Sequence, residues 1–334
     1  MNHFDLSKGT IDKDDMYIDC SLPTNMYHYT SKEGLLGILK GEELYFSHMA
    51  YVNDTNELMD IFELLLKMEK SIKEIGKKAF KNSCDSSNKE ADKNIKIIEA
   101  SVDEIMKYVM TFKTIGSSNE GFVKKSYDEL HTFSLSFCKN EDSLCTWSNY
   151  TDKSGYNISI NANNLKDYLK QSFKSEKIAF NYGSVIYDDG EKKEVIIKMF
   201  EEFFEAFKSN SGEVRELQTH LAMLIILHAP FFKKSVLKQE QEIRFSIIVQ
   251  KDILKKYINF KQSNGLTIPY FNMEGNFSEY YEGIKIGPLV KEFNKESLFL
   301  FLTYMKNEQQ KDKLEYNLKI EKENITKSQI TYRW

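Results

Sequence analysis

The sequence predicts a strand, a helix and a second strand between residues 26 and 47, and this unit constrains the fold more than any other feature of the chain. Its first strand, 26–30, is an aromatic run that includes His28. Ser31 is a favourable N-cap for a helix of about eight residues, which Gly41 would end. The aromatic segment Leu44–Ser47 then returns as a strand. Polar side chains at the ends of such a unit are typical of a ligand-binding enzyme more than of a scaffold.

Composition places the chain among ordinary globular proteins. Of its 334 residues, 41% are hydrophobic and 29% are charged. The longest apolar run, Leu221–Phe232, is interrupted by His228 and Pro230 and is shorter than the roughly 20 residues that cross a bilayer, so no membrane partner is expected. The N-terminal residues are polar and acidic, unlike a secretory signal. The four cysteines lack metal-ligand or redox spacing, and we expect free thiols in a cytoplasmic protein.

The charge balance and the absence of common motifs disfavour several function classes. The formal net charge of -4 gives no overall basic field, which argues against nonspecific nucleic-acid binding but leaves a local basic groove open. The sequence contains no GxGxxG, P-loop, HExxH or GxSxG motif. Dehydrogenase, kinase, zinc-protease and serine-hydrolase functions therefore lose support.

The remaining segments predict a single α+β domain, 1–334, without internal repeats or an obvious linker. Residues 58–131 are expected to form a helical insertion or lid, with an exposed loop at 80–94. Further strands are expected at 132–138, 155–160, 179–187, 242–249, 281–286 and 330–334, and helices at 143–150, 190–228 and 291–306.

His28, with Tyr29 and Thr30 beside it, is the first candidate for chemistry. An imidazole at the end of a strand can contact a ribose hydroxyl or act as an acid or base. The alternative is a core histidine whose ring is satisfied by the backbone.

Two more polar or aromatic groups have helical spacing. Asn53, Asp54 and Glu57 can share one helix face, although a helix N-cap with a solvated acid explains them equally well. Trp147 and Tyr150 are three residues apart and can grip a flat ring by stacking, although ordinary core packing is the alternative.

Glu240, Glu242 and Arg244 open a predicted strand with polar residues at every second position. If the strand extends that far, the three side chains lie on one face. One carboxylate could stabilise an oxocarbenium-like centre and the other could orient a nucleophile or a ribose hydroxyl. The guanidinium could hold the pair ionised or bind a phosphate with two hydrogen bonds. The alternative is a structural ion-pair ladder on the surface.

These motifs, in this order, resemble those of a bacterial family known as domain of unknown function 2971. The resemblance spans residues 26 to 333. The matching positions are Tyr27 to Thr30, Ile38 to Ser47, Asn53, Asp54 and Glu57, Ser136, Trp147, Tyr150 and Gly155, Glu240, Glu242 and Arg244, Gly287 and Pro288, and Ser328 to Arg333.

The first unit is also similar to the opening of ADP-ribosyltransferase-like folds, which include RNA 2'-phosphotransferases and DNA-modifying toxins. The resemblance implies a split mixed or antiparallel sheet with helical insertions, and NAD as a substrate. His28 would contact a ribose hydroxyl of NAD, and Tyr150 would stack on nicotinamide. Glu242 would serve the transition state, and Glu240 would complete an E-x-E similar to that of arginine-modifying toxins. Many of those toxins have Arg where this chain has His28.

The residue roles implied by this resemblance fall into two sets. The catalytic set is Glu242, Glu240 and His28, and the NAD-binding set is His28, Tyr29, Thr30, Ser47, Asn53, Asp54, Trp147, Tyr150 and Arg244. No metal ligand is implied.

The implied reaction is cleavage of the bond between nicotinamide and ribose, with a protein, a nucleic acid or water as the acceptor. Such an activity suits a toxin or a phage-defence effector, and a partner or antitoxin protein would fit it. Two alternatives stay open. One is a noncatalytic sensor that binds a nucleotide-like ligand. The other is a metal-dependent nucleic-acid-processing enzyme that uses Asp54, Glu57, Glu240 and Glu242.

Overall fold

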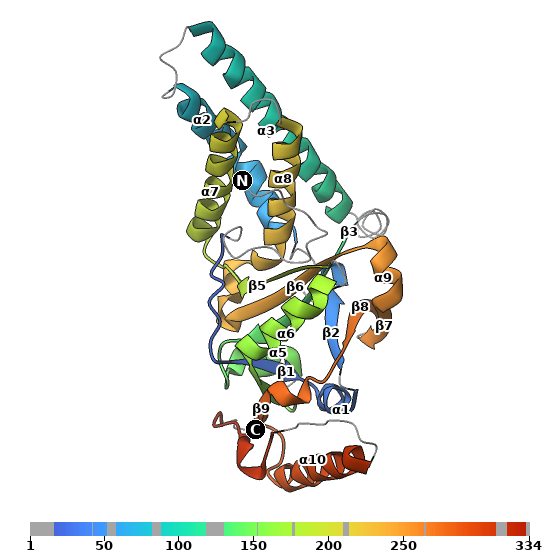
Figure 1. Ribbon diagram of the computed structural model, residues 1–334. Coiled ribbons are helices and arrows are strands. Elements are labelled where there is room, and N and C mark those ends of the chain that lie inside the picture. The colour runs from blue at the N-terminus through green and yellow to red at the C-terminus, as the bar shows by residue number, and fades with distance from the viewer. Residues whose placement is uncertain are drawn as a thin grey trace.

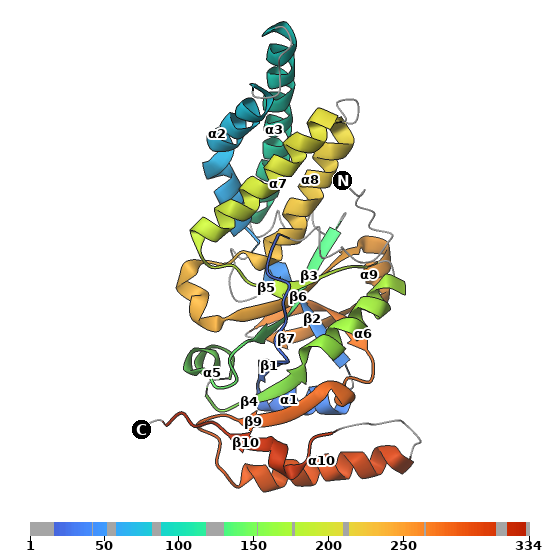
Figure 2. The same cartoon turned by 60° about the vertical axis from the view of Figure 1, so that its left-hand side comes forward.

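The computed structural model shows a mixed α+β fold with an open, mixed sheet and several helices (Figure 1). It describes residues 17–41, 43–51, 58–81, 88–117, 130–151, 153–175, 178–209, 214–263, 265–311 and 319–331. A helical layer lies at one end of the molecule, the sheet lies in the middle, and one further helix lies at the opposite end (Figures 1 and 2).

The helices and strands follow in chain order with these bounds. The helices are α1 Lys32–Gly41, α2 Asp60–Lys81, α3 Asn88–Ser117, α5 Leu144–Thr151, α6 Ala162–Ser175, α7 Asp189–Ser209, α8 Val214–His228, α9 Lys251–Tyr257 and α10 Asn294–Lys311. The strands are β1 Asn25–Thr30, β2 Glu43–His48, β3 Leu130–Cys138, β4 Tyr156–Asn161, β5 Ala179–Ser184, β6 Glu242–Gln250, β7 Ile258–Ser263, β8 Leu266–Glu274, β9 Tyr281–Ile286 and β10 Ile325–Lys327.

The sheet runs in the order β10-β9-β4-β1-β3-β2-β8-β7, and β6 joins β3 to β5 outside this path. The β10–β9 pair is parallel, and the other pairs in the described sheet are antiparallel. Among the described strands, only β7 and β8 form a hairpin with a short connection, and the other antiparallel pairs join strands that are far apart in the sequence.

The sheet divides at β3. Strand β6 pairs with β3 along its whole length, from Leu130 to Cys138, so it occupies one edge of that strand. Both β1 and β2 must therefore share the other edge. Tyr27 of β1 pairs with Cys138 near one end, and Ser47 of β2 pairs with Ser134 further along. Ser136 lies between these two pairings, and we call this division of the sheet the fork.

Alternation along β3 and β6 separates an apolar face from a polar face. Phe133, Phe137 and Phe245 enter the sheet core, which α6 helps to cover. Ser136 and Arg244 are opposite each other in register and lie on the other face, toward the end of α8.

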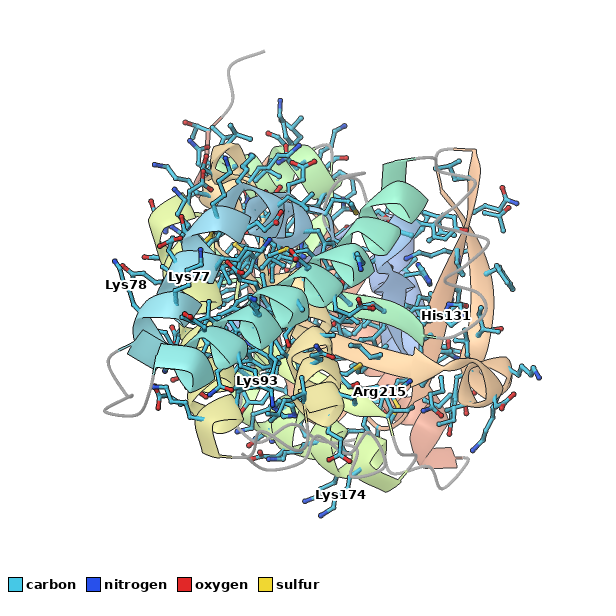
Figure 3. The ribbon with its side chains drawn as sticks, turned by 90° about the horizontal axis from the view of Figure 1, so that it is seen from above. Lys77, Lys78, Lys93, His131, Lys174 and Arg215 are labelled. Atoms are coloured by element: carbon cyan, nitrogen blue, oxygen red, sulfur yellow. The ribbon has the colours of Figure 1, made fainter. Side chains whose placement is uncertain are left out.

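The helical layer has its own apolar core, built from α2, α3, α7 and α8. Charged side chains of α2 and α3 point away from this core, among them Lys77, Lys78 and Lys93 (Figure 3). The predicted helical part, 58–131, thus packs on two helices that come much later in the chain. Whether it acts as a lid stays a prediction.

Most predicted elements of the described chain are confirmed within a few residues, and three differ. The predicted loop 80–94 is too long, because α2 continues to Lys81 and α3 begins at Asn88. Charged residues that form helices well can extend a helix without an apolar face. The predicted last strand, 330–334, lies mostly outside the described residues. The strand that the structure describes there is Ile325–Lys327, and after it Ser328 and Gln329 bind Asp142. Helix α9 and the hairpin of β7 and β8 were not predicted. Within the described residues, no helix is both long and apolar enough to span a bilayer.

Candidate functional site at the fork

His28 lies at the fork with its ring held in one orientation. Nδ1 of the ring is 3.1 Å from the carbonyl oxygen of Ser136. A carbonyl can only accept, so the ring donates through Nδ1–H and carries its lone pair on Nε2. The ring also lies edge-on to Phe137, with 5.9 Å between ring centres. Among the described residues, Nε2 of His28 has no hydrogen-bond partner.

The surroundings keep this imidazole neutral. Burial lowers the pKa of His28 below its ordinary 6.5, and the charge of Lys261 lowers it further, against the opposing effect of the Ser136 carbonyl. A neutral ring with a fixed tautomer presents a hydrogen-bond acceptor, which suits a ligand hydroxyl or a proton that has to be removed.

Ser47 and Lys261 lie on the other side of the fork. The Lys261 ammonium donates to the Ser47 hydroxyl at 3.1 Å. Tyr270, the register partner of Ser47 on β8, lies beneath this contact, with its ring centre 5.9 Å from Nζ of Lys261. The ring of Tyr45 lies 4.3 Å from that of Tyr270. A hydroxyl, a cation and two aromatic rings thus lie together on this side of the fork. Ser47 pairs with Ser134, which shares a sheet face with Ser136 and Arg244, so this group lies on the face opposite to the one that His28 faces.

A buried ion cluster lies one strand away from the fork. Glu242 binds Arg244 through two hydrogen bonds, at 2.7 Å to Nε and 2.9 Å to one terminal nitrogen. Lys233 donates to Glu242 at 3.0 Å and to Glu240 at 2.6 Å. The other terminal nitrogen of Arg244 donates to the carbonyl of Pro230 at 2.5 Å. All four charged side chains are buried.

These contacts fix the charge of Glu242. Burial by itself would raise the pKa of this carboxyl group. The charges of Arg244 and Lys233, with hydrogen bonds from Arg244 and Ser136, outweigh burial and hold the pKa at about 2. The carboxylate is therefore ionised at neutral pH, and it can stabilise positive charge but cannot serve as a general acid.

The expected alignment of three residues on one strand holds for two of them. Glu242 and Arg244 share a face of β6, whereas Glu240 precedes the strand, in a short helical turn over Ser235–Glu240. Gln241 between them has a left-handed backbone, with φ of 44°, and this turn ends the regular alternation. Lys233 brings the two carboxylates together in place of strand geometry. The ladder is buried and does not lie on the surface.

Ser136 connects the fork with the ion cluster. Its carbonyl accepts from His28, and its side chain hydrogen-bonds to Glu242. The side chains of His28 and Glu242 nevertheless point to opposite faces of the sheet. Tyr27 is in register with Cys138, which is in register with Glu242, so the neighbour His28 faces the other way.

Two of the predicted aromatic ligand residues lie in packed surroundings. Trp147 is fully buried, donates its indole N–H to Asp142 at 2.7 Å, and meets Tyr29 edge-on. The Tyr29 hydroxyl donates to the carbonyl of Asn140 at 2.9 Å and accepts from the backbone N–H of Ser143 at 3.0 Å. These contacts hold the start of α5 against β1.

The other predicted residues are more dispersed. Tyr150 is 38% exposed on α5, and Thr30 packs on the first turn of α1. Asn53 and Asp54, with Glu57, lie outside the described residues. One further polar residue of α5, Asn149, reaches Glu240 at 3.5 Å, so this helix borders the ion cluster.

Sequence reasoning missed three residues of this region, Lys261, Tyr270 and Lys233. The first two lie on the β7–β8 hairpin, whose signal is present in the sequence as Asn264-Gly265 between two β-rich runs. Lys233 had no comparable signal, because two adjacent lysines resemble a solvated surface turn.

Comparison with known proteins supports the family resemblance over part of the chain. Residues 146–245 match a family model described as a protein of unknown function, DUF2971. The match includes Trp147, Glu242 and Arg244, and it ends before the β7–β8 hairpin. No curated protein and no solved structure matches the chain. The comparisons therefore do not show the ADP-ribosyltransferase-like resemblance.

Proposed function

We propose that the chain binds NAD at the fork and transfers its ADP-ribosyl group, as ADP-ribosyltransferase-like enzymes do. The observation that carries the proposal is the state of His28, a neutral ring whose Nδ1–H binds Ser136 and whose Nε2 is left to accept. A ribose hydroxyl is a donor of the kind that this nitrogen can bind. Ser47, Lys261 and Tyr270, on the opposite face of the sheet at the fork, add groups suited to a nucleotide.

The proposed reaction breaks the bond between nicotinamide and the ribose carbon. Nicotinamide leaves with the electron pair, and positive charge develops on the ribose carbon until an acceptor oxygen or nitrogen attacks it. The acceptor loses its proton to solvent or to a base. His28 would hold a ribose hydroxyl. Glu242 faces the opposite side of the sheet, so its ionised carboxylate would favour the transition state only through the field it exerts across the sheet and not by contact with the ribose. Water as the acceptor would make the enzyme a glycohydrolase.

In this proposal the ion cluster controls how much negative charge Glu242 can offer to a ligand. Arg244 and Lys233 occupy its oxygens, so its net charge is largely neutralised before any ligand arrives. Its catalytic use requires that one of these contacts lengthens when NAD binds. The Ser136 side chain, bonded to Glu242 and adjacent to the His28 contact, is the direct route by which occupancy of the fork would reach the cluster.

The test is release of nicotinamide from NAD by the purified chain, followed by chromatography in the presence of EDTA. Glu242→Gln and His28→Asn are the variants, and cell lysate is added in a parallel arm to supply an acceptor. Release by the wild type and not by the variants supports the proposal. Absence of nicotinamide release in both arms, with no rise in melting temperature when NAD is added, contradicts the proposal. A parallel run with Mg²⁺ and without EDTA tests the metal-dependent alternative, because activity that appears only in that run would favour it.

A noncatalytic nucleotide sensor is the second candidate, and the neutralised carboxylates favour it. Both Glu240 and Glu242 already bind Lys233, which is the arrangement of a structural ion cluster. A sensor would bind NAD or a related nucleotide without turnover, and Glu242→Gln would leave that affinity nearly unchanged. Calorimetry on the wild type and this variant, beside the nicotinamide assay, separates the two candidates.

The biological setting follows as part of the same proposal. An NAD-consuming transferase suits a toxin or phage-defence effector, with a protein or nucleic acid as acceptor. The lysate arm identifies that acceptor when labelled NAD is used, because the label then appears in protein or in nucleic acid. A partner or antitoxin protein would be found by its suppression of the same signal.

A further inference from the structure

Lys261 is a half-buried lysine whose ammonium group meets no carboxylate among the described residues. It belongs to β7 and reaches across Tyr270 of β8 to donate to Ser47 of β2. Its other contact is with the ring of Tyr270. Among the described residues, the cation is therefore held in place by neutral groups.

Several other lysines withdrawn from solvent in the described chain have oxygen partners that balance the charge or solvate it. Lys233 binds two carboxylates, and Lys192, only 1% exposed, binds Asp60 at 2.6 Å. Lys327 donates to several backbone carbonyls, including that of Pro288 at 3.0 Å. Removing a charge from water without a partner is costly, so such a group usually marks a place where a ligand supplies the counter-charge.

We propose that Lys261 and Ser47 form a phosphate-binding subsite at the fork, and that the phosphate belongs to a nucleotide whose base packs on Tyr270 and Tyr45. The Lys261 ammonium and the Ser47 hydroxyl are hydrogen-bonded to each other, so the oxygens of one phosphate group can contact both. Tyr45 is 37% exposed and its hydroxyl is anchored on Glu43 at 2.8 Å, so its ring is accessible and its orientation is fixed.

The chemistry of the subsite favours phosphate over other ligands. An ammonium group and a hydroxyl both donate to an anion, and the ammonium repels a metal ion. Burial lowers the pKa of Lys261, and a bound anion would reverse that shift. The phosphate donors Lys261 and Ser47 lie beside the rings of Tyr270 and Tyr45, on the sheet face opposite to His28. An anion site next to two aromatic rings suits the phosphate and the base of a nucleotide.

This inference rests on the proposed function for the nucleotide identity of the ligand, although the phosphate contact stands independently of any turnover. The experiment is calorimetry with adenosine, ADP and inorganic pyrophosphate on the wild type and on Lys261→Met and Lys261→Arg. Lys255→Met is the matched control, because that lysine lies on the neighbouring helix α9 and its side chain is 71% exposed.

We expect the wild type and Lys255→Met to bind ADP at least about 10-fold more tightly than adenosine. A factor of this size is what one charge-assisted hydrogen bond contributes to the binding free energy. Lys261→Met should lose that preference and retain adenosine binding, and Lys261→Arg should keep most of it. Equal affinity of the wild type for ADP and adenosine overturns the subsite. An unchanged preference in Lys261→Met, or no binding of any of the three ligands at millimolar concentration, overturns it as well.

Two further results separate this inference from the proposed function. If Lys261→Met cleaves NAD with an unchanged KM, the function stands and the subsite is wrong. If no variant or wild type cleaves NAD while Lys261→Met still abolishes the ADP preference, the subsite stands and the function is wrong. An NMR pH titration of Lys261→Met without ligand shows whether the variant is folded, and it also measures the pKa of His28. The pKa of His28 should rise when the charge of Lys261 is removed.

Discussion

The carbonyl oxygen of Ser136 lies 3.1 Å from Nδ1 of His28, and this contact sets which nitrogen of the ring meets a ligand. The carbonyl belongs to the one part of the β3 edge that lies between the pairings with β1 and β2. The same residue bonds to Glu242 through its side chain. Ser136 therefore contacts both His28 and Glu242, two of the residues for which the sequence predicted a role in chemistry.

Replacing His28 by Asn should separate the two roles of the ring. The amide nitrogen of Asn can still donate to the Ser136 carbonyl, but Asn has no acceptor at the place of Nε2. We expect kcat/KM for NAD to fall by about 10- to 100-fold, the cost of one lost hydrogen bond to a substrate hydroxyl, with little change in melting temperature. Steady-state nicotinamide release checks this. Full activity in a folded His28→Asn protein would remove His28 from the site.

Lys233→Met should destabilise the protein, whereas Lys261→Met should not. Removing Lys233 leaves Glu240 and part of Glu242 buried without their cation, and loss of one partner of such a pair costs about 3–5 kcal/mol. Removing Lys261 deletes a half-buried cation that no described carboxylate balances. Urea unfolding of both variants measures the difference, and similar losses in both would show that Lys261 has a structural counter-charge.

The free energy of unfolding should fall in mild acid. Burial lowers the pKa of His228 to about 4 from the ordinary 6.5, partly opposed by the Leu224 carbonyl. The unfolded chain therefore binds more protons than the folded chain below pH 6.5. The stability from His228 is complete above that pH and decreases by about 3 kcal/mol as the pH falls to 4.

His228→Gln is the control for this pH dependence. Gln can replace both contacts of the ring, the acceptor for the backbone N–H of Tyr17 and the donor to Leu224, without titrating. Denaturant unfolding between pH 7.5 and 4 should give a shallower slope for the variant. The slope should not vanish, because burial also lowers the pKa of His48, to about 3. An unchanged slope would assign the acid sensitivity to other groups.

Gly34→Ala should destabilise the protein, and Thr30→Ala should relieve the effect. A Cβ at Gly34 would lie 2.1 Å from the Thr30 hydroxyl oxygen, and its next contacts are no closer than 3.4 Å. We expect a loss of about 1–3 kcal/mol for the single variant, as in other overpacked sites. The double variant should recover most of it, because Ala favours the helix interior over Gly. Thermal unfolding of the two single variants and the double variant completes the cycle.

The sequence was a good guide where local patterns decide structure. The aromatic strand around His28 and the capped helix after Ser31 fold as expected, because alternation and capping act over a few residues. Glu242 and Arg244 share a face for the same reason. Lys233 joins them by a contact with two carboxylates that become neighbours only when the chain before β6 turns back, which no local pattern reports.

The candidate site was harder to predict than the fold. Lys261 and Ser47 are separated by 214 positions in the chain, and their contact depends on the order β2-β8-β7. Trp147 is a conspicuous aromatic in the sequence, yet Asp142 and Tyr29 enclose it. Spacing along a helix could suggest that Trp147 has a partner, but it could not tell a ligand ring from a protein ring.

The fork also divides the sheet into two wings that meet at β3. The wing with β1, β4, β9 and β10 carries His28, and the wing with β2, β8 and β7 carries Ser47 and Lys261. Each wing has its own hydrogen-bond ladder, and only short pairings attach the two wings to β3. A ligand bound at Ser47 and Lys261 would therefore rest on one wing alone, and it would be felt at His28 only through β3.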